Sequence, residues 1–236
     1  MGGLFVVIDG TDGSGKKTQT EIVVRLLNDL GYRAERVEFP QHGTRSATLV
    51  DDYLNGKYGT AEQVGPHIAS LFYACDRYDA SFRIRKLLEE GVIIVSDRYV
   101  CSNMGHQASK FSDPEERDEF LDWLIDLEYR IFKIPQPDIN LILYMPTAVS
   151  QQLIDKKTLR QYIKPEQQNK DIHERDTKHL TAAAETYLYV AKKYGWEVLV
   201  CADDSKPKQI PEITKEIMRV IGKHLEQNAG LRNYLR

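Results

Sequence analysis

A glycine-rich loop between an apolar run and an amphipathic segment constrains this chain more than any other feature. Residues 4–8 (LFVVI) are typical of a buried strand, and residues 10–16 (GTDGSGK) follow almost at once. From Gly15 to Leu30 the apolar residues recur on one helical face, and Gly31 ends the segment. A strand, a glycine-rich turn and a helix N-terminus, in this order, surround a phosphate group with backbone N–H groups.

The loop matches the phosphate-binding pattern G-x-x-x-x-G-K-[ST] except at its last position. Lys17 stands where the pattern has Ser or Thr, and Thr18 follows one residue later. The helix N-terminus adds a partial positive charge, and Lys16 can reach the terminal phosphates of a nucleotide. We expect nine consecutive residues to bind the phosphates of ATP: Gly10, Thr11, Asp12, Gly13, Ser14, Gly15, Lys16, Lys17 and Thr18.

Strand and helix patterns alternate along the rest of the chain. Further strands are predicted at residues 34–39, 92–95, 140–144 and 197–200. Helices are predicted at residues 15–30, 61–79, 80–90, from Asp113 onward, and from Ile210 to Leu225. Strands separated by helices form right-handed crossovers. The pattern therefore predicts an α/β fold with a mainly parallel five-stranded sheet and helices on both faces.

The helix predicted at residues 61–79 has two faces of interest. We expect an apolar stripe to face the core, consisting of Val64, Ile68, Leu71, Phe72 and Cys75. Tyr73 and Arg77 are four residues apart and therefore share a face. An aromatic ring beside a guanidinium can stack on a nucleobase and hydrogen-bond to its edge. Phe72 is the alternative stacking residue.

Two other groups of residues lie where strands are predicted to end. Asp97 and Arg98 follow the strand at residues 92–95, and Phe39 and Pro40 close the strand at residues 34–39. Ligands of open α/β sheets bind beyond the carboxyl ends of the strands. We therefore expect Asp97 and Arg98 to lie beside the phosphate loop, with the Phe-Pro turn at the same edge.

The composition of the 236 residues is that of one globular domain over residues 1–236, with 42% hydrophobic and 28% charged residues. A formal net charge of −3 argues against a nucleic-acid partner. No apolar run approaches the ~18 residues of a membrane span, and no signal peptide is visible, so we expect no membrane association. Three widely spaced cysteines are typical of reduced thiols and favour the cytoplasm: Cys75, Cys101 and Cys201.

One long polar segment lies between two helical patterns at about residues 155–178, which are rich in Lys, Gln, Asp and Glu. The residues alone leave two interpretations open, a solvated surface segment or a lid that closes over phosphates. The C-terminal residues 228–236 are expected to be frayed.

Five segments in order closely resemble the thymidylate kinase (dTMP kinase) family, the nucleoside-monophosphate kinases with a P-loop fold. The resemblance covers roughly residues 4–191. The segments are the loop at residues 10–16, FPQHG at 39–43, YACDR at 73–77, DRYVCSN at 97–103 and DIHERD at 171–176. The resemblance implies a three-layer P-loop NTPase fold in which the polar segment is a mobile lid. It also implies transfer of the γ-phosphate of ATP to dTMP with Mg²⁺ as cofactor, and a homodimer.

The resemblance also implies roles for individual residues. Catalytic roles fall to Lys16, Arg98, Asp12 and Asp97, with Asp97 organising the water shell of Mg²⁺. Tyr73 stacks on thymine and Arg77 contacts its carbonyl edge. The residues expected to bind dTMP are Phe39, Pro40, His42, Tyr73, Arg77, Arg98, Asn103, His106, Gln107, His173 and Glu174. The lid contributes Lys157, Arg160 and Asp171, and its two cations approach the donor because Gly13 stands where some members have an arginine.

Other functions are weighed against this one. A GTPase is rejected because residues 169–172 (NKDI) miss the guanine-reading pattern Asn-Lys-x-Asp by one position. A kinase acting on another nucleoside or nucleoside monophosphate is the nearest alternative. A nucleoside kinase needs a carboxylate after the second strand, where residues 39–41 (FPQ) have none. Lys17 motivates a further alternative, a catalytically silent nucleotide-binding module.

Overall fold

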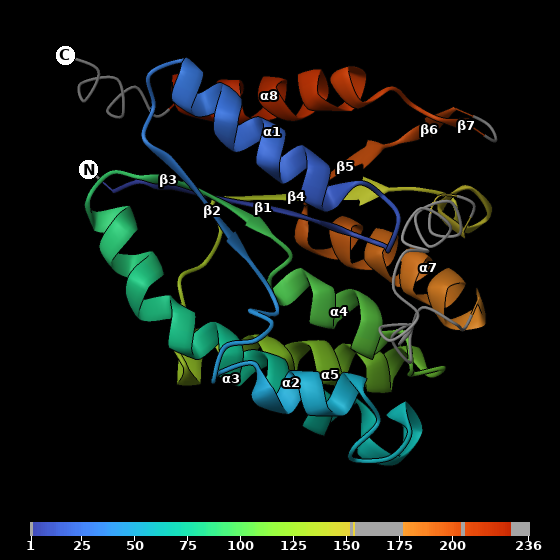
Figure 1. The fold of residues 1–236 in the computed structure, drawn as a ribbon. Helices are drawn as coiled ribbons and strands as arrows, with labels where there is room; N and C mark the ends of the chain where they lie inside the picture. Colours follow the sequence, from blue (N-terminus) through green and yellow to red (C-terminus); the bar gives the residue numbers. More distant parts are fainter. Residues whose placement is uncertain (1, 152, 154–176, 204–205, 228–236) are drawn as a thin grey trace, which may run out of the picture.

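A five-stranded parallel sheet forms the centre of the molecule in the computed structural model (Figure 1). The structure describes residues 2–151, 153, 177–203 and 206–227. The strands are β1 (Leu4–Gly10), β2 (Ala34–Glu38), β3 (Ile93–Asp97), β4 (Ile139–Tyr144) and β5 (Glu197–Val200). Their order is β2-β3-β1-β4-β5, and every pairing is parallel. The predicted α/β class and the five-stranded sheet are confirmed.

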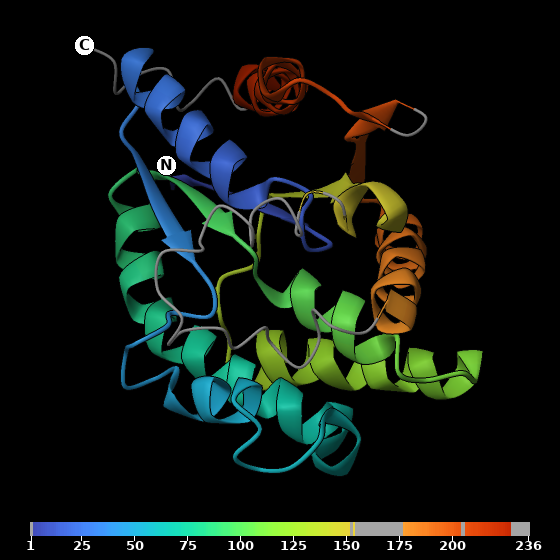
Figure 2. The ribbon, with the colours of Figure 1, turned by 45° about the vertical axis from the view of Figure 1, so that its right-hand side comes forward.

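Helices cover both faces of the sheet, which gives three layers (Figures 1 and 2). Helices α1 (Lys16–Asp29) and α8 (Ile210–Gln227) lie on one face. The other face is covered by α3 (Ala61–Glu89), α4 (Val100–Ala108), α5 (Pro114–Ile125) and α7 (Thr177–Tyr194). The short helix α2 (Thr48–Leu54) packs on α3, away from the sheet.

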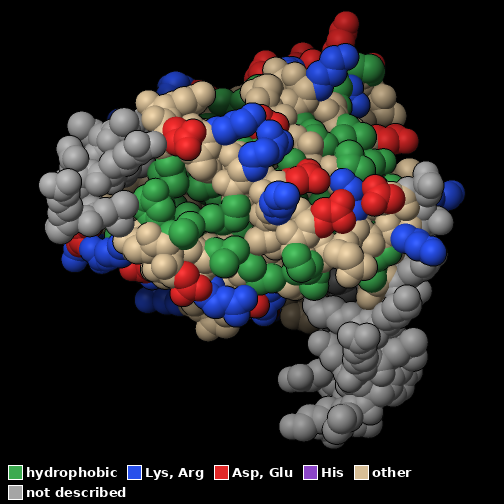
Figure 3. All heavy atoms as spheres, turned by 90° about the horizontal axis from the view of Figure 1, so that it is seen from above, with side chains coloured by type: hydrophobic (Ala, Val, Ile, Leu, Met, Phe, Trp, Pro, Cys, Tyr) green, Lys and Arg blue, Asp and Glu red, His purple; other side chains and the backbone are tan. Residues whose placement is uncertain are grey.

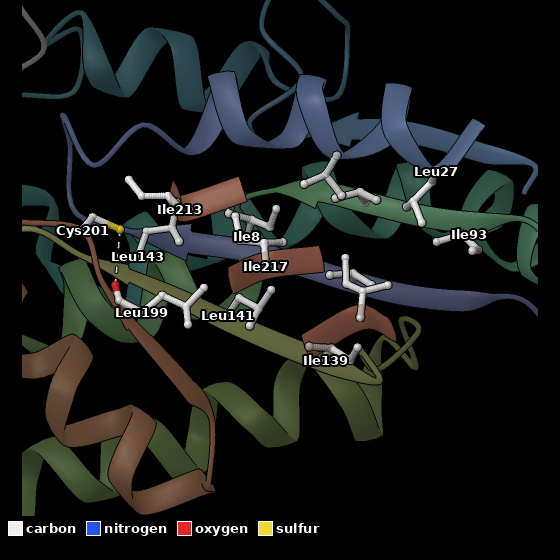
Figure 4. Close-up of a cluster of buried hydrophobic side chains, with 14 of the residues drawn as sticks. Ile8, Leu27, Ile93, Ile139, Leu141, Leu143, Leu199, Cys201, Ile213 and Ile217 are labelled. Carbon is white, nitrogen blue, oxygen red and sulfur yellow. Dashed lines mark hydrogen bonds between the residues drawn. The ribbon is translucent and has the colours of Figure 1, made fainter. Parts of the chain in front are cut away.

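Alternate residues of β1 enter two separate cores, because successive side chains of a strand point to opposite faces. Leu4, Val6 and Ile8 belong to the core under α1 and α8, whereas Phe5 and Val7 belong to the core under the other helices. Figure 4 shows the first core, where side chains from the strands meet those of the two helices. Burial on both faces explains why the β1 segment is an unbroken apolar run.

The predicted start of α5 is confirmed in detail. The side chain of Asp113 accepts hydrogen bonds from the N–H groups of Glu115 (2.7 Å) and Glu116 (3.2 Å), and Pro114 is the first helical residue. An acidic N-cap followed by proline satisfies N–H groups that would otherwise have no partner in the first turn.

Two predictions for the region of α3 are wrong. Helix α3 (Ala61–Glu89) has no break at residues 79–80, where two helices were predicted to meet; its kink lies instead at Gly65, where the backbone is non-helical. The apolar stripe is not the buried face, since Ile68 is 48% exposed and Cys75 is exposed. The buried face instead carries small and polar side chains, among them Ser70 and Arg77. A hydrophobic pattern cannot detect a helix face that buries small and polar side chains.

Several elements are absent from the sequence-based expectations. They are α2, α4, the π-helix η1 (Asp126–Ile131), and a small antiparallel pair made of β6 (Ala202–Asp203) and β7 (Lys206–Pro207). Helix α4 escapes detection because its residues are small or polar at many positions. Strand β3 also extends to Asp97, so this carboxylate belongs to the strand itself.

The surface over α1 and α8 carries basic and acidic side chains interspersed with each other, with no extended field of one sign (Figure 3). Among the described helices, none combines the length and apolar character needed to cross a membrane.

Two isoleucines of α8 provide a matched test of this architecture. Ile217 is fully buried in the core, whereas Ile210 is 48% exposed. We expect Ile217→Ala to lower the free energy of unfolding by about 2–5 kcal/mol, because it removes buried methyl groups and leaves a cavity. Ile210→Ala should change it by less than about 0.5 kcal/mol. Urea denaturation of both variants checks this, and equal losses would contradict the assigned packing of α8.

Candidate active site

The loop between β1 and α1 folds as the sequence predicts, with glycines at its strained positions. Gly10 has φ 135°, and a Cβ atom there would lie 2.3 Å from the carbonyl oxygen of Leu143 on β4. Gly15 has φ 89° and directly precedes α1. Lys16 is 6% exposed, and its ammonium group donates to the carbonyl of Thr11 (2.7 Å). The lysine therefore lies along the inside of the loop.

Two hydroxyl groups of the loop are buried and have no partner among the described residues. Thr11 Oγ1 and Ser14 Oγ make no hydrogen bond to the described residues. Buried polar groups are almost always paired, so a concave loop with two unpaired hydroxyls fits an anion that accepts hydrogen bonds. The side chains of Lys17 and Thr18, by contrast, are exposed on the first turn of α1.

Arg98 reaches across from the end of β3 to the loop. Its Nη2 donates to Asp12 Oδ1, and Lys16 Nζ lies 3.8 Å from the same oxygen. Burial raises the pKa of Asp12, but Arg98 and Lys16 outweigh it and hold that pKa well below its usual range. Burial and Arg98 lower the pKa of Lys16 to about 8, against the opposing effect of Asp12. Asp12 and Arg98 are thus both charged at neutral pH.

The backbone of Arg98 is held in a strained conformation. Its φ is 68°, in the left-handed region, which costs a non-glycine residue on the order of 1–3 kcal/mol. Two hydrogen bonds stabilise it, from Arg98 N–H to the carbonyl of Ile8 (3.0 Å) and from Ser96 Oγ to the carbonyl of Arg98 (2.5 Å). This conformation directs the side chain towards the loop, and such strain is typical of functional sites.

Asp9 is a site residue that the sequence analysis missed. Its carboxylate is fully buried and accepts from the N–H groups of Gly10 (2.8 Å) and Tyr99 (3.2 Å). It also accepts from the hydroxyls of Ser102 (2.8 Å) and Tyr187 (2.8 Å). One carboxylate therefore joins β1, the start of α4 and α7. The acid that ends an apolar strand is visible in the sequence, but Tyr187, 178 residues away, is not.

A pocket of about 420 Å³ opens beside Arg98 and Asp12. Nine of the eleven residues predicted to bind dTMP line it: Phe39, Pro40, His42, Tyr73, Arg77, Arg98, Asn103, His106 and Gln107. Tyr73 lines the pocket, whereas Phe72 packs against the rings of Tyr53 and Tyr58. Tyr73 is therefore the better candidate for stacking. Asp51 and Leu54 of α2, and Asn55 directly after it, also line the pocket, which the sequence did not suggest.

Arg77 does not extend freely into the pocket, as a base clamp would require. It is 1% exposed and pairs with Glu128 of η1, which is fully buried. Its Nε donates to Glu128 Oε1 (3.0 Å), and its Nη1 donates to the carbonyl of Tyr99 (3.4 Å). Burial lowers the pKa of Arg77, but Glu128 outweighs it and the net shift is upward. The guanidinium is a fixed, charged part of the pocket wall.

The last described residues of the predicted site are His42, His106 and Asp97. His42 Nδ1 lies 2.5 Å from Asp51 Oδ1 at the exposed rim. The ring of His106 lies 5.7 Å from that of His179 and 5.6 Å from that of Tyr187, measured between centroids. Asp97 pairs with Ile8 of β1 in the sheet, and its Oδ2 accepts from Arg36 (3.1 Å).

The remaining predicted site residues lie outside the described residues. They are Lys157, Arg160, Asp171, His173 and Glu174, together with nearly all of the predicted lid at 155–178 and the tail at 228–236. Only residues 177 and 178 of the lid are described, and they begin α7.

Comparison with known proteins gives a consistent result. A family model described as thymidylate kinase matches residues 8–202. The chain is 31% identical to human thymidylate kinase over 148 residues, which are 62% of this chain and 63% of the human protein, slightly less than two thirds of its length. It is 25% identical over 209 residues to thymidylate kinase of Mycobacterium tuberculosis (strain ATCC 25618 / H37Rv), covering 88% of this chain and 95% of that one.

Among solved structures, thymidylate kinase from Candida albicans is similar, with a TM-score of 0.69 and 20% sequence identity. The superposition covers 98% of this chain and 94% of that one. At this identity the likeness supports the fold.

The buried Arg77–Glu128 pair yields a stability prediction. Glu128→Gln leaves the Arg77 guanidinium buried without a counter-charge, and we expect it to lower the free energy of unfolding by about 3–5 kcal/mol. The exposed pair between Asp126 and Arg130 in the same helical segment is the matched control. Asp126→Asn should have little effect, because water screens exposed ion pairs. Denaturant unfolding of both variants checks the prediction, and equally small effects would contradict it.

Proposed function

The chain belongs to the thymidylate kinase family, and from this premise we propose that it transfers the γ-phosphate of ATP to dTMP, giving ADP and dTDP for dTTP synthesis. The observation that carries the proposal is the position of Arg98. Its guanidinium contacts the phosphate loop at Asp12 and also lines the pocket that contains Tyr73. A donor phosphate in the loop and an acceptor phosphate in the pocket would therefore meet at this side chain.

The proposed mechanism rests on positioning and charge. Phosphoryl transfer needs little covalent help from the protein, but two polyanions must be held in line against their repulsion. Lys16 and the loop hold the donor phosphates from one side, and Arg98 contacts the transferring and acceptor phosphates from the other. The contact with Asp12 raises the pKa of Arg98 against the effect of burial, so the guanidinium stays charged. Asp12 also orients Arg98 for the acceptor.

In the proposed complex the thymine base occupies the inner part of the pocket. Tyr73 stacks on the ring, while Arg77, Asn103 and Gln107 face its polar edge. Arg77 is held by Glu128, so recognition relies on a preformed wall. Phe39, Pro40, His42 and His106 shape the outer part of the pocket, and His173 and Glu174 are proposed to contact dTMP from the lid. Lys157 and Arg160, with Asp171 in the same segment, are proposed to approach the donor phosphates.

Mg²⁺ is the proposed cofactor, and Asp97 the residue that would hold it through water. Asp97 lies at the carboxyl end of β3 beside the loop, and its Oδ1 makes no hydrogen bond to the described residues. Those residues contain no group of three or more His, Cys, Asp or Glu side chains that could chelate a metal. This donor set fits Mg²⁺, which keeps several waters and binds through one or two carboxylates and the substrate phosphates. When bound, the ion would neutralise charge on the donor phosphates.

We further propose a cytoplasmic homodimer. The support for a dimer is an exposed apolar surface on α3 and η1, where Tyr78, Phe82 and Ile131 are 42%, 58% and 56% exposed. Contiguous apolar surfaces of this kind often mark subunit interfaces.

The acceptor preference tests the proposed reaction directly. The protein is incubated with ATP, Mg²⁺ and each of dTMP, dCMP, AMP, GMP and CMP, and the ADP released is measured. Preference for dTMP supports the proposal. Preference for AMP, GMP or CMP would assign a different monophosphate kinase, and tight nucleotide binding without transfer at any Mg²⁺ concentration would assign a silent binding module.

Arg98→Ala is expected to lower kcat with dTMP by about 10³ or more, because it removes the charge that faces the transferring phosphate. Arg83, which forms an exposed ion pair with Glu35, offers a control for loss of an arginine. Arg83→Ala should leave kcat within about twofold. If kcat of Arg98→Ala falls by less than about tenfold, Arg98 has a structural rather than a catalytic role.

Lys16 gives a pH-dependent prediction. With a pKa of about 8 in the free protein, Lys16 is charged below pH 8 and neutral above it, so nucleotide affinity should fall as the pH rises past 8. Phosphates favour the charged form, and ADP binding at pH 8 should therefore take up about half a proton. Calorimetry in buffers of different ionisation enthalpy measures this uptake. Lys16→Arg stays charged and should show none, and equal uptake by both proteins would disprove the assignment.

A further inference from the structure

Two amide side chains line the pocket, those of Asn103 and Gln107, and each forms a hydrogen bond to a neighbouring protein group. Asn103 Nδ2 donates to the carbonyl of Ser70 (3.3 Å), and Gln107 Oε1 accepts from Lys110 Nζ (2.7 Å). An ammonium group only donates hydrogen bonds, so the amide oxygen of Gln107, rather than its nitrogen, must face Lys110. Each amide is therefore fixed in one of its two possible orientations.

This orientation decides which atoms remain for a ligand. Gln107 is 1% exposed and lines the pocket, and its Nε2 donates to none of the described residues. Asn103 is 2% exposed, and its Oδ1 accepts from none of them. The pocket wall thus offers a donor at Gln107 and an acceptor at Asn103. Arg77 also lines this wall, and its three nitrogens donate to Glu128 and to the carbonyl of Tyr99.

Lys110 itself is well fixed, at the turn that follows α4. Its backbone N–H donates to the carbonyl of Gln107 (3.2 Å), and its ammonium group also lies 3.5 Å from Tyr53 Oη. Burial lowers the pKa of Lys110 to about 8, while Glu62 opposes the shift. Most molecules therefore carry the charged, donor-only form at pH 7.

We propose that Lys110 is a positioning residue for base selection, which fixes the Gln107 amide so that the pocket accepts a 4-keto pyrimidine and rejects a 4-amino pyrimidine. Thymine presents an acceptor oxygen at its 4-position, whereas cytosine presents an amino group that donates. The N–H donor of Gln107 can form a hydrogen bond with the 4-keto oxygen of thymine, whereas it would face another donor in the 4-amino group of cytosine. The inference rests on the proposed function, because it concerns the base of the acceptor nucleotide.

The test compares kcat/KM for dTMP and for dCMP at pH 7 in the wild type and three variants of Lys110. Lys110→Met removes the donor and frees the amide to rotate, and we expect the dTMP/dCMP ratio to fall roughly tenfold, as for one hydrogen bond. Lys110→Arg remains donor-only and should keep the ratio. In Lys110→Glu the new carboxylate accepts from Gln107 Nε2, which turns Gln107 Oε1 towards the pocket. The dTMP/dCMP ratio of this variant should therefore fall below that of Lys110→Met.

The change should appear mainly in KM for dTMP, because the base is remote from the reacting phosphates. Lys86 is an exposed lysine on α3, and Lys86→Met should match the wild type. The ratio is independent of the folded fraction, since both acceptors are assayed on the same sample, so partial unfolding of a variant does not affect it.

Two results would overturn the inference: an unchanged ratio in Lys110→Met, or equal losses in Lys110→Met and Lys110→Arg. Both are distinct from failure of the proposed function, in which the wild type itself would not prefer dTMP.

Discussion

The buried carboxylate of Asp9 is the interaction on which the rest of the site depends. It stands at the end of β1 and binds the N–H of Tyr99, the hydroxyl of Ser102 and the hydroxyl of Tyr187. A charge without water is stable only when it is fully hydrogen-bonded, so these partners have little freedom to move. Fixing Tyr99 also fixes the strained backbone of Arg98 just before it. The phosphate loop and Arg98 are thereby held at one edge of the sheet.

Polar pairs in the interior form the walls of the pocket in the same way. Arg77 is paired with Glu128, and the Gln107 amide is held by Lys110. Asp76, also buried on α3, accepts from the N–H of Gln41 (2.8 Å) and so anchors the turn at residues 39–41. For a buried ion pair, the desolvation cost offsets most of the attraction, so the pair stabilises the fold little more than packed apolar side chains would, although loss of one partner alone is costly. They keep donors and acceptors in place before a ligand arrives, which reduces the free energy spent on ordering them.

Features that depend on residues close together in the chain are predictable from the sequence, and features that depend on distant residues are not. The loop at residues 10–16, the five strands of the main sheet and the cap at Asp113 were predicted correctly because they depend on neighbours within a few residues. The juxtaposition of Arg98 with the loop followed from a topological rule for parallel sheets. The buried face of α3 was mispredicted, because hydrophobic periodicity assumes an apolar interior, whereas this face buries small and polar side chains, of which Arg77 lines the pocket.

The sequence by itself determined the α/β class and the fold of the glycine-rich loop, since these are encoded by local spacing and by the order of strands. Its resemblance to a known family, rather than spacing, supplied most of the residues that line the pocket. Only the tertiary structure decided which charges pair and which atoms remain exposed to a ligand. Glu128 is 51 residues from Arg77, and Tyr187 is 178 residues from Asp9. The physical reason is that a buried charge needs a partner in space, and folding rather than sequence spacing brings the two together.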